Sequence, residues 1–400
     1  MGGMRYAEIS GIPKYETIGF QVISVFFLIL FYLEVNHRMQ GIDLGKKVSY
    51  RLLTIDEVDK MEQVVVLDNL VLDVSKYKWE HPGGAFLFDQ LKGRDISKFY
   101  YGGYSLEAGV KPVKHSKIAD IVMRTLVVGE ISWKGKNFEG HIVVKGEVNK
   151  LTSVITIDLR KDSIEVEQIE SLGKHVLIGN NNEKRQYTIA NSMRPSTYES
   201  LLEQINDSIN GRKVQRDSIV QSNDVTLVVK NYKTGISKFL NEAPLSQPVS
   251  LRGPLGKGLN LKQDETVVAF VGGTGVLVFM DLVALLARQA LNLSPTQIGN
   301  AFKLILHVSF ESRAQSIGLS LLEKYQELVQ KKGLNNFELH LRFGDEDEGK
   351  WGKEYAKKQF KGRDLAKTRF LVCGPPKMNA VLNRAFEELS KEEKIRYEVL

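Results

Sequence analysis

Two short motifs place functional groups on tight turns. In Trp79-Glu80-His81-Pro82-Gly83-Gly84, the proline bars His81 from helical dihedral angles and the glycines permit close backbone approach. The turn therefore presents an imidazole, which alone is also typical of an exposed turn. In Gly272-Gly273-Thr274-Gly275, a glycine turn joins a buried-type strand to an apolar helix. Backbone amides at such a helix N-terminus can bind a pyrophosphate, although a turn that only needs positive dihedral angles would read the same way.

A third group of residues could bind a flavin. Arg185, Tyr187 and Thr188 lie at alternate or adjacent positions of one expected strand. An arginine can bind a pyrophosphate, a tyrosine can stack on an isoalloxazine, and a threonine can hydrogen-bond a ribityl chain. Any amphipathic strand can show this pattern by chance, so the pattern needs support from its surroundings.

Residues 51–131 resemble cytochrome b5. The resemblance rests on the His81 motif, on Gly93-Arg94-Asp95-Ile96-Ser97-Lys98-Phe99, on His115-Ser116-Lys117-Ile118-Ala119 and on Val127-Val128-Gly129-Glu130-Ile131. It implies that His81 and His115 bind the iron of heme b from opposite faces. An iron with both axial positions filled moves single electrons and has no open site for oxygen. The histidines are 34 positions apart, more than the family usually shows, which indicates an inserted loop near 100–114.

The order of motifs after residue 146 resembles the ferredoxin–NADP reductase superfamily, and within it the cytochrome b5 reductases. Cys373-Gly374-Pro375-Pro376-Lys377-Met378 follows a second strand and is specific to that superfamily. The resemblance implies FAD and NADH or NADPH as cofactors. It assigns catalytic positions to Cys373, which would border the nicotinamide, and to Lys230. It assigns cofactor binding to Arg185, Tyr187, Thr188, Tyr232, Ser237, Gly272, Gly273, Thr274, Gly275, Gly374, Pro375 and Met378.

The chain departs from the reductase pattern in several places. Gln186 replaces a usual proline, Val278 replaces another, and the C-terminus ends in Leu400 rather than an aromatic residue. Discrimination between NADH and NADPH depends on groups after the second strand of the nucleotide domain. Glu311 and Arg313 supply one group of each sign there. The resemblance favours NADH.

These motifs predict a multidomain fold. We expect an N-terminal anchor and tether at 1–49, an α+β cytochrome b5-like domain at 50–131 and a linker at 132–145. An antiparallel β-barrel FAD domain at 146–262 and an α/β Rossmann-like NAD domain at 263–400 would follow. Strands are expected at 64–67, 70–74 and 303–310, and helices at 276–288 and 319–331.

A stretch near the N-terminus could cross a membrane. Residues 17–33 carry no charge, and a helix of this length would span about 25 Å. A buried core helix is the alternative. Tyr15 and Tyr32 lie where an interfacial aromatic belt would place them. The basic residues that follow predict a single-pass protein with its soluble domains on the side of synthesis, in the endoplasmic reticulum or a mitochondrial membrane.

Composition limits the alternatives. The 400 residues are 42% hydrophobic and contain one cysteine, which excludes an internal disulfide and any multi-cysteine metal site held by this chain alone. The net charge of +7 is diffuse, so no nucleic-acid partner is expected. The sequence thus predicts electron transfer from NAD(P)H through FAD to heme and on to a membrane-bound acceptor or membrane protein complex. The alternative is a structural or accessory subunit of a membrane complex, with reduced or lost reductase activity.

Overall fold

The computed structural model describes residues 50–102, 105–106, 110–131, 136–159, 171–179, 183–214, 224–346 and 351–400. The chain forms two compact units, 1–50 with 116–127 and 51–115 with 128–400. The described part of the first unit contains helix α5 (Lys117–Thr125), whose N-cap Ser116 accepts a hydrogen bond from the Ala119 amide. The predicted membrane segment at 17–33 lies outside the described residues.

The second unit begins with a small α+β module, which we call the heme module (51–115 and 128–131). Its four-stranded sheet has the order β1-β4-β3-β2, and its helix α2 begins with a capping box between Thr54 and Glu57. The core under the sheet is apolar and includes Val58, Val66 and Ile131. The elements are β1 (Leu52–Leu53), α2 (Ile55–Lys60), β2 (Val64–Leu67), β3 (Leu70–Asp73), η1 (Tyr77–Trp79), α3 (Phe86–Leu91), α4 (Ser97–Tyr100) and β4 (Val127–Ile131).

Six antiparallel strands follow, in the order β8-β7-β10-β5-β6-β9. A barrel was predicted; the described strands form a sheet whose end strands approach where the Ala190 amide donates to the Thr226 carbonyl at 2.9 Å. The elements are β5 (Lys136–Asn149), β6 (Thr152–Asp158), β7 (His175–Gly179), β8 (Lys184–Thr188), η2 (Asn191–Met193), α6 (Pro195–Ile209), β9 (Asp224–Lys230), α7 (Gly235–Glu242) and β10 (Pro248–Leu255).

The first strand of this sheet corrects one expectation. Residues 136–145 were predicted to lie in a linker, but they form the first part of β5. These residues read as polar because buried and more exposed side chains alternate along the strand. Phe138 and Ile142 are the buried side chains and belong to the core. The sheet domain therefore begins before residue 146.

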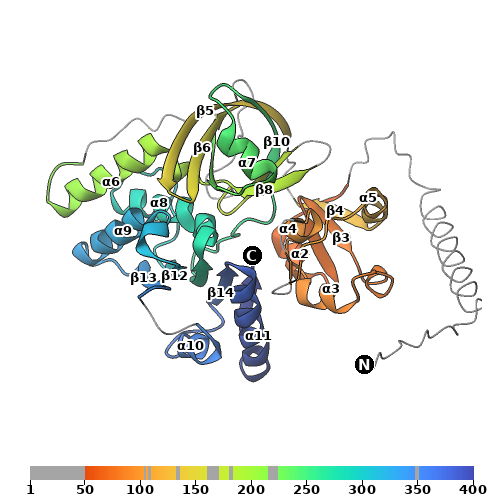
Figure 1. Cartoon of the computed structure of the whole chain (residues 1–400). Coiled ribbons are helices and arrows are strands. Elements are labelled where there is room, and N and C mark those ends of the chain that lie inside the picture. The colour runs from red at the N-terminus through yellow and green to blue at the C-terminus, as the bar shows by residue number, and fades with distance from the viewer. Residues whose placement is uncertain are drawn as a thin grey trace, which may run out of the picture. The chain divides into compact units, whose positions relative to one another are not determined.

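The last domain is a five-stranded parallel sheet in the order β13-β12-β11-β14-β15. Strands β12, β13 and β14 are labelled in Figure 1. On β11, Val267, Ala269 and Val271 pack into the core with α8 and α9, whereas Val268 and Phe270 pack with α11. The strands are β11 (Thr266–Gly272), β12 (Lys303–Phe310), β13 (Phe337–Phe343), β14 (Thr368–Cys373) and β15 (Arg396–Val399). The helices are η3 (Gly273–Val276), α8 (Leu277–Ala290), η4 (Arg313–Gln315), α9 (Leu319–Lys331), α10 (Lys353–Lys358) and α11 (Pro376–Glu392).

Within the described part of the chain, one helical stretch, Gly273–Ala290, is long and apolar enough to cross a membrane. It comprises η3 and α8. Most of it is buried in the core of the parallel-sheet domain, where Phe279, Leu282 and Leu286 are inaccessible to solvent. Its apolar character is therefore explained by packing between the sheet domains.

Candidate functional site

The structure brings the two predicted heme ligands together. The ring centroids of His81 and His115 lie 6.2 Å apart with an angle of 31° between the rings. An iron bound by two imidazole nitrogens at about 2 Å each would hold ring centroids about 6 Å apart. The spacing of the imidazoles therefore fits one six-coordinate iron between them.

Local contacts orient both imidazoles. His115 Nδ1 lies 2.9 Å from the Tyr100 carbonyl oxygen, which can only accept, so Nδ1 carries the proton and Nε2 keeps its lone pair. The Tyr100 ring stacks on His115 at 4.5 Å. On the other side, the Gly83 amide donates to His81 Nδ1 at 3.1 Å. Ligation of iron through Nε2 of His81 requires the proton on Nδ1, so this contact must be released on loading.

Glycine is required beside His81 because of space. A Cβ atom at Gly83 would lie 2.8 Å from the His81 ring and 2.7 Å from Leu87. Phe88 packs edge-on against the same imidazole at 4.9 Å. The Pro-Gly-Gly turn and Phe88 of α3 thus both contact the His81 ring and restrict its orientation.

The electrostatics keep the His81 ring neutral, which is the charge state that metal binding requires. Burial, assisted by the charge of His115, holds the pKa of His81 below its usual range, so the ring is neutral near pH 7. Large apolar side chains stand uncovered next to the two histidines in sequence: Trp79 is 74% exposed and Val113 is 73% exposed. Apolar surface of this kind suits a flat, mainly apolar group, and the residues present therefore fit heme b.

The two nucleotide motifs meet at the carboxyl ends of adjacent parallel strands. Val271 of β11 pairs with Cys373 of β14, which places the turn at Gly272–Gly275 beside Gly374. A Cβ atom at Gly275 would lie 2.0 Å from the Cys373 carbonyl oxygen, and one at Gly374 would lie 2.3 Å from Met378. Both glycines are therefore required by close approach between the turns.

The remaining members of this group lie around the same turn. A Cβ atom at Gly272 would meet Pro375 at 2.8 Å, while Gly273 has a φ of +54° and Thr274 is exposed. Cys373 ends β14, and burial raises the pKa of its thiol, an effect that the charge of Lys98 partly offsets. A neutral thiol suits a residue that packs beside a reacting ring and does not itself act as a nucleophile.

The predicted flavin residues gather on β8 and α7. The Arg185 guanidinium stacks on the Tyr232 ring at 4.8 Å. The Tyr187 hydroxyl and Ser237 Oγ share a hydrogen bond of 2.9 Å. Tyr187 is only 7% exposed and belongs to the sheet core, so its ring is not free to stack on a flavin.

The N-terminus of α7 is open to an anion. Its N-cap Thr234 makes no side-chain capping bond, and Gly235 has a φ of +74°. A Cβ atom at Gly235 would lie 3.4 Å from a carboxylate oxygen of Glu183. A helix N-terminus together with Arg185 fits a diphosphate, provided that the Glu183 carboxylate gives way.

Thr188 and Lys230, two further predicted residues, each stand at the end of a strand. Thr188 ends β8 and pairs with His175 of β7. Lys230 ends β9 with an exposed side chain, and the Tyr232 amide donates to its carbonyl at 2.9 Å. The predicted flavin residues thus stand on β8, at the end of β9 and at the start of α7.

Of the two residues expected to influence the choice between NADH and NADPH, Arg313 has defined partners in the structure. Arg313 lies 3.2 Å from Glu323 and 3.7 Å from Glu346, and it packs over the Phe343 ring at 4.4 Å. These three contacts engage the guanidinium with groups of this chain, and the side chain of Glu311 is exposed.

Sequence reasoning missed Lys98 and Asp281. Lys98 donates to the Leu400 carbonyl, and burial lowers its pKa to about 8. Asp281 of α8 accepts bonds from the amides of Asn191 and Ser192 at 3.1 and 2.7 Å, which ties the two sheet domains together. Nothing local marks either residue, because each acts across more than 80 positions of sequence.

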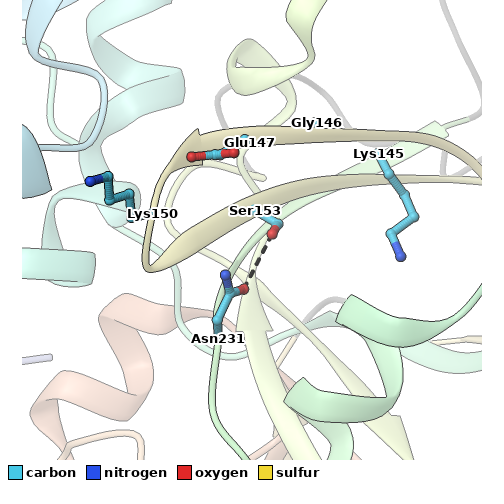
Figure 2. A pocket seen from close by; sticks show the side chains of 6 residues that line it. All are labelled: Lys145, Gly146, Glu147, Lys150, Ser153 and Asn231. Carbon is cyan, nitrogen blue, oxygen red and sulfur yellow. Dashed lines mark hydrogen bonds between the residues drawn. The ribbon is translucent and has the colours of Figure 1, made fainter.

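A surface cavity of about 490 Å³ lies on the sheet domain, and its lining includes Asn231, which stands between the predicted site residues Lys230 and Tyr232 (Figure 2). It is lined by Lys145, Gly146, Glu147, Lys150, Ser153 and Asn231. Lys145 Nζ donates to the carbonyls of Asn241 and Ala243 at the end of α7, each at 2.6 Å. The lining contains none of the predicted site residues, and Lys145 serves the helix C-terminus.

Comparison with known proteins finds a matching family model and a curated relative. Residues 54–132 match the family described as cytochrome b5-like heme/steroid binding domain. A curated relative, the uncharacterized oxidoreductase AIM33 of Saccharomyces cerevisiae, is 30% identical over 171 residues, which is 40% of this chain. The chain spans about half the length of that relative.

Solved structures that are similar to this chain include the CS-b5R domains of human Ncb5or, at 18% identity and a TM-score of 0.48. That match covers 68% of this chain and 72% of the other. The cytochrome b5 reductase domain of Ulva prolifera nitrate reductase matches at 16% identity and a TM-score of 0.45, over 66% of this chain and 97% of the other. Over residues 54–132 the chain thus resembles cytochrome b5-like heme/steroid binding domains, and over 171 residues it resembles a curated oxidoreductase.

Proposed function

We propose that this protein transfers electrons from NADH through a flavin to a bis-histidine heme, and from there to a partner. The observation that carries the proposal is the facing pair His81 and His115 at 6.2 Å between ring centroids. With both axial positions taken by imidazoles, the heme would supply one-electron chemistry and no open coordination site. The protein's own part is to hold, orient and tune these groups.

The residues have separate tasks in this scheme. His81 and His115 hold the iron through neutral imidazoles. Arg185 and the N-terminus of α7 bind the flavin diphosphate by charge and backbone amides. The turn at Gly272–Gly275 binds the pyrophosphate of NADH, and Cys373 packs beside the nicotinamide as a neutral thiol. FAD, when bound, supplies the conversion between hydride and single-electron transfer.

An absorbance experiment tests the proposal. The full-length chain, loaded with heme and FAD, should show a Soret band that shifts on addition of NADH. His115→Ala should lose the low-spin bis-imidazole spectrum and keep flavin absorbance, whereas His141→Ala, a histidine on β5, should change neither. A Soret band that is indifferent to NADH in the loaded chain would contradict the electron-transfer function.

A second candidate is an accessory subunit of a membrane complex. Tyr187 and Ser237 satisfy one another in the core, and Leu400 stands where the resemblance leads one to expect an aromatic residue. A chain that purifies with a larger assembly and neither binds FAD nor responds to NADH would support this role.

The cellular setting is also part of the proposal. Residues 17–33 would anchor the chain in the endoplasmic reticulum or a mitochondrial membrane, with the soluble domains on the side of synthesis. The electron acceptor would then be a membrane-bound protein or complex. The support for both statements is the uncharged stretch and the basic residues that follow it.

A further inference from the structure

The heme module lies against the strand that carries the predicted flavin residues. Helix α4 contacts β8, and Lys184 at the start of β8 lies 6.0 Å from the centre of the Tyr101 ring. The Tyr101 hydroxyl donates to Asp68 at 2.8 Å, within the heme module itself. Residues of α4 and its C-terminal end thus contact β8.

The same helix reaches the nucleotide side of the site. Lys98 donates to the Leu400 carbonyl, and its charge acts on the Cys373 thiol. Arg94, just before α4, donates through Nε to the Val399 carbonyl at 3.0 Å. One segment of the heme module therefore stands next to Cys373 and the C-terminal strand as well as next to β8.

A polar latch holds the module in this position. Lys257, after β10, donates to Asp59 at 3.0 Å and to the Gly93 carbonyl at 2.9 Å, and it also pairs with Glu398 at 3.3 Å. Burial opposes its charge, but the two carboxylates outweigh burial and raise the pKa of Lys257, so the ammonium stays charged.

A second set of contacts joins the module to the end of β10. The carboxylate of Asp68, which is 3% exposed, lies 3.5 Å from the Arg252 guanidinium. The Gly256 amide lies 3.0 Å from the Asp68 carbonyl and 3.1 Å from Asn69 Oδ1. Backbone hydrogen bonds and ion pairs of this kind define one docked geometry.

These contacts lie next to the residues that the resemblance assigns to the flavin and the nicotinamide. Hydride transfer needs the two reacting rings within about 3–3.5 Å of each other, and Cys373 is the residue expected beside the nicotinamide. Lys98 lies next to that cysteine, and α4 contacts the strand expected to bind the flavin. We propose that docking of the heme module and binding of FAD are mutually exclusive, so that the docked chain is the flavin-free state. This inference rests on the proposed function, because it assumes that the reductase half can take FAD.

The proposal predicts that weaker docking strengthens flavin binding. The apparent dissociation constant rises as the competent fraction falls, so a variant that undocks the module should bind FAD more tightly. Lys98→Met keeps the length of the side chain and removes its charge. The full-length heme-loaded chain, equilibrated by dialysis against FAD, should bind at least tenfold more tightly as Lys98→Met or Lys257→Met than as wild type. Lys92→Met, at an exposed lysine of the same module, should bind like wild type.

A measurement on the unaltered chain guards against misfolded variants. Saturating FAD should increase amide hydrogen exchange across 93–101 of the wild type. Equal and tight FAD binding by wild type and both variants, with no change in exchange, would overturn exclusivity and leave the proposed function standing. If neither the wild type nor any variant bound FAD, both the exclusivity and the proposed function would be contradicted, since the reductase half would then have no flavin site.

Discussion

At the scale of single residues, chemistry is decided by which atom of a side chain is left free. His115 has its Nδ1 proton held by the Tyr100 carbonyl, and Nε2 is therefore the only nitrogen available to a metal. Cys373 illustrates the opposite case, because burial keeps its thiol protonated and leaves it a packing role. The surroundings of each residue therefore set its role: His115 can bind a metal, and Cys373 packs as a neutral thiol.

Replacing Cys373 tests its placement beside the nicotinamide. Cys373→Ala removes one atom from the wall against which the ring would pack, and a small displacement of reacting groups can cost about 100-fold in rate. We expect the NADH-dependent rate of flavin reduction to fall by about that factor in stopped-flow measurements, with affinity for NAD⁺ nearly unchanged. An unaltered rate would assign Cys373 to the ordinary buried small residues.

Coenzyme preference should not depend on Arg313. The guanidinium is engaged by Glu323 and Glu346 and packs over an aromatic ring. We therefore expect Arg313→Ala to leave the ratio of kcat/KM for NADH and NADPH unchanged, with NADH preferred. Glu311→Gln should narrow that preference by about tenfold, because like charges placed close together disfavour binding. A preference for NADPH that Arg313→Ala abolishes would show that the arginine binds the 2′-phosphate.

At the scale of elements, adjacent parallel strands create pairs that no single strand encodes. His307 of β12 and His340 of β13 are in register, and their rings stack at 4.4 Å. His307 is inaccessible to solvent, and its Nδ1 lies 3.0 Å from the Tyr355 hydroxyl. Burial, reinforced by His340 and partly offset by Glu338, lowers the pKa of His307 to about 3.

This pKa makes the parallel-sheet domain sensitive to acid. Because the folded pKa lies below the unfolded value of about 6.5, the contribution to stability is complete above pH 6.5 and is lost as pH falls toward 3. The unfolding free energy should fall by about 1.4 kcal/mol per pH unit across this window. His307→Gln, which cannot gain charge but can still bond Tyr355, should show a shallower dependence by calorimetry. His141→Gln should keep the wild-type dependence, and an identical slope in His307→Gln would refute the assignment.

At the scale of the whole molecule, the N-terminal segment should be separable from the redox domains. Removal of residues 1–40 leaves every described element intact, since the first is β1 at Leu52. We expect the shortened chain to remain in the supernatant after fractionation and to retain its Soret absorbance. The full-length chain should resist extraction by carbonate and need detergent. Release of the full-length chain by carbonate alone would exclude a transmembrane anchor.

The sequence by itself determined the local chemistry. Pro82 and the glycines after it restrict the backbone around His81, and the strand-to-helix turn at Gly272–Gly275 is specified by residues within a few positions of one another. Strand β12 and helix α9 span the residues that periodicity predicted. Restrictions of this kind act through dihedral angles and short-range hydrogen bonds, so they can be read without knowledge of the rest of the chain.

Tertiary structure alone decided which local features become neighbours. It brings His81 to His115 across 34 positions, sets Gly275 against Cys373, and makes a strand of residues 136–145 because Phe138 and Ile142 find a core to enter. It also carries Lys98 to Leu400, about 300 positions away, which no motif in either segment indicates. Such contacts depend on the packing of whole sheets and helices, whose apolar faces can be recognised in a sequence but whose partners are selected only when the complete core forms.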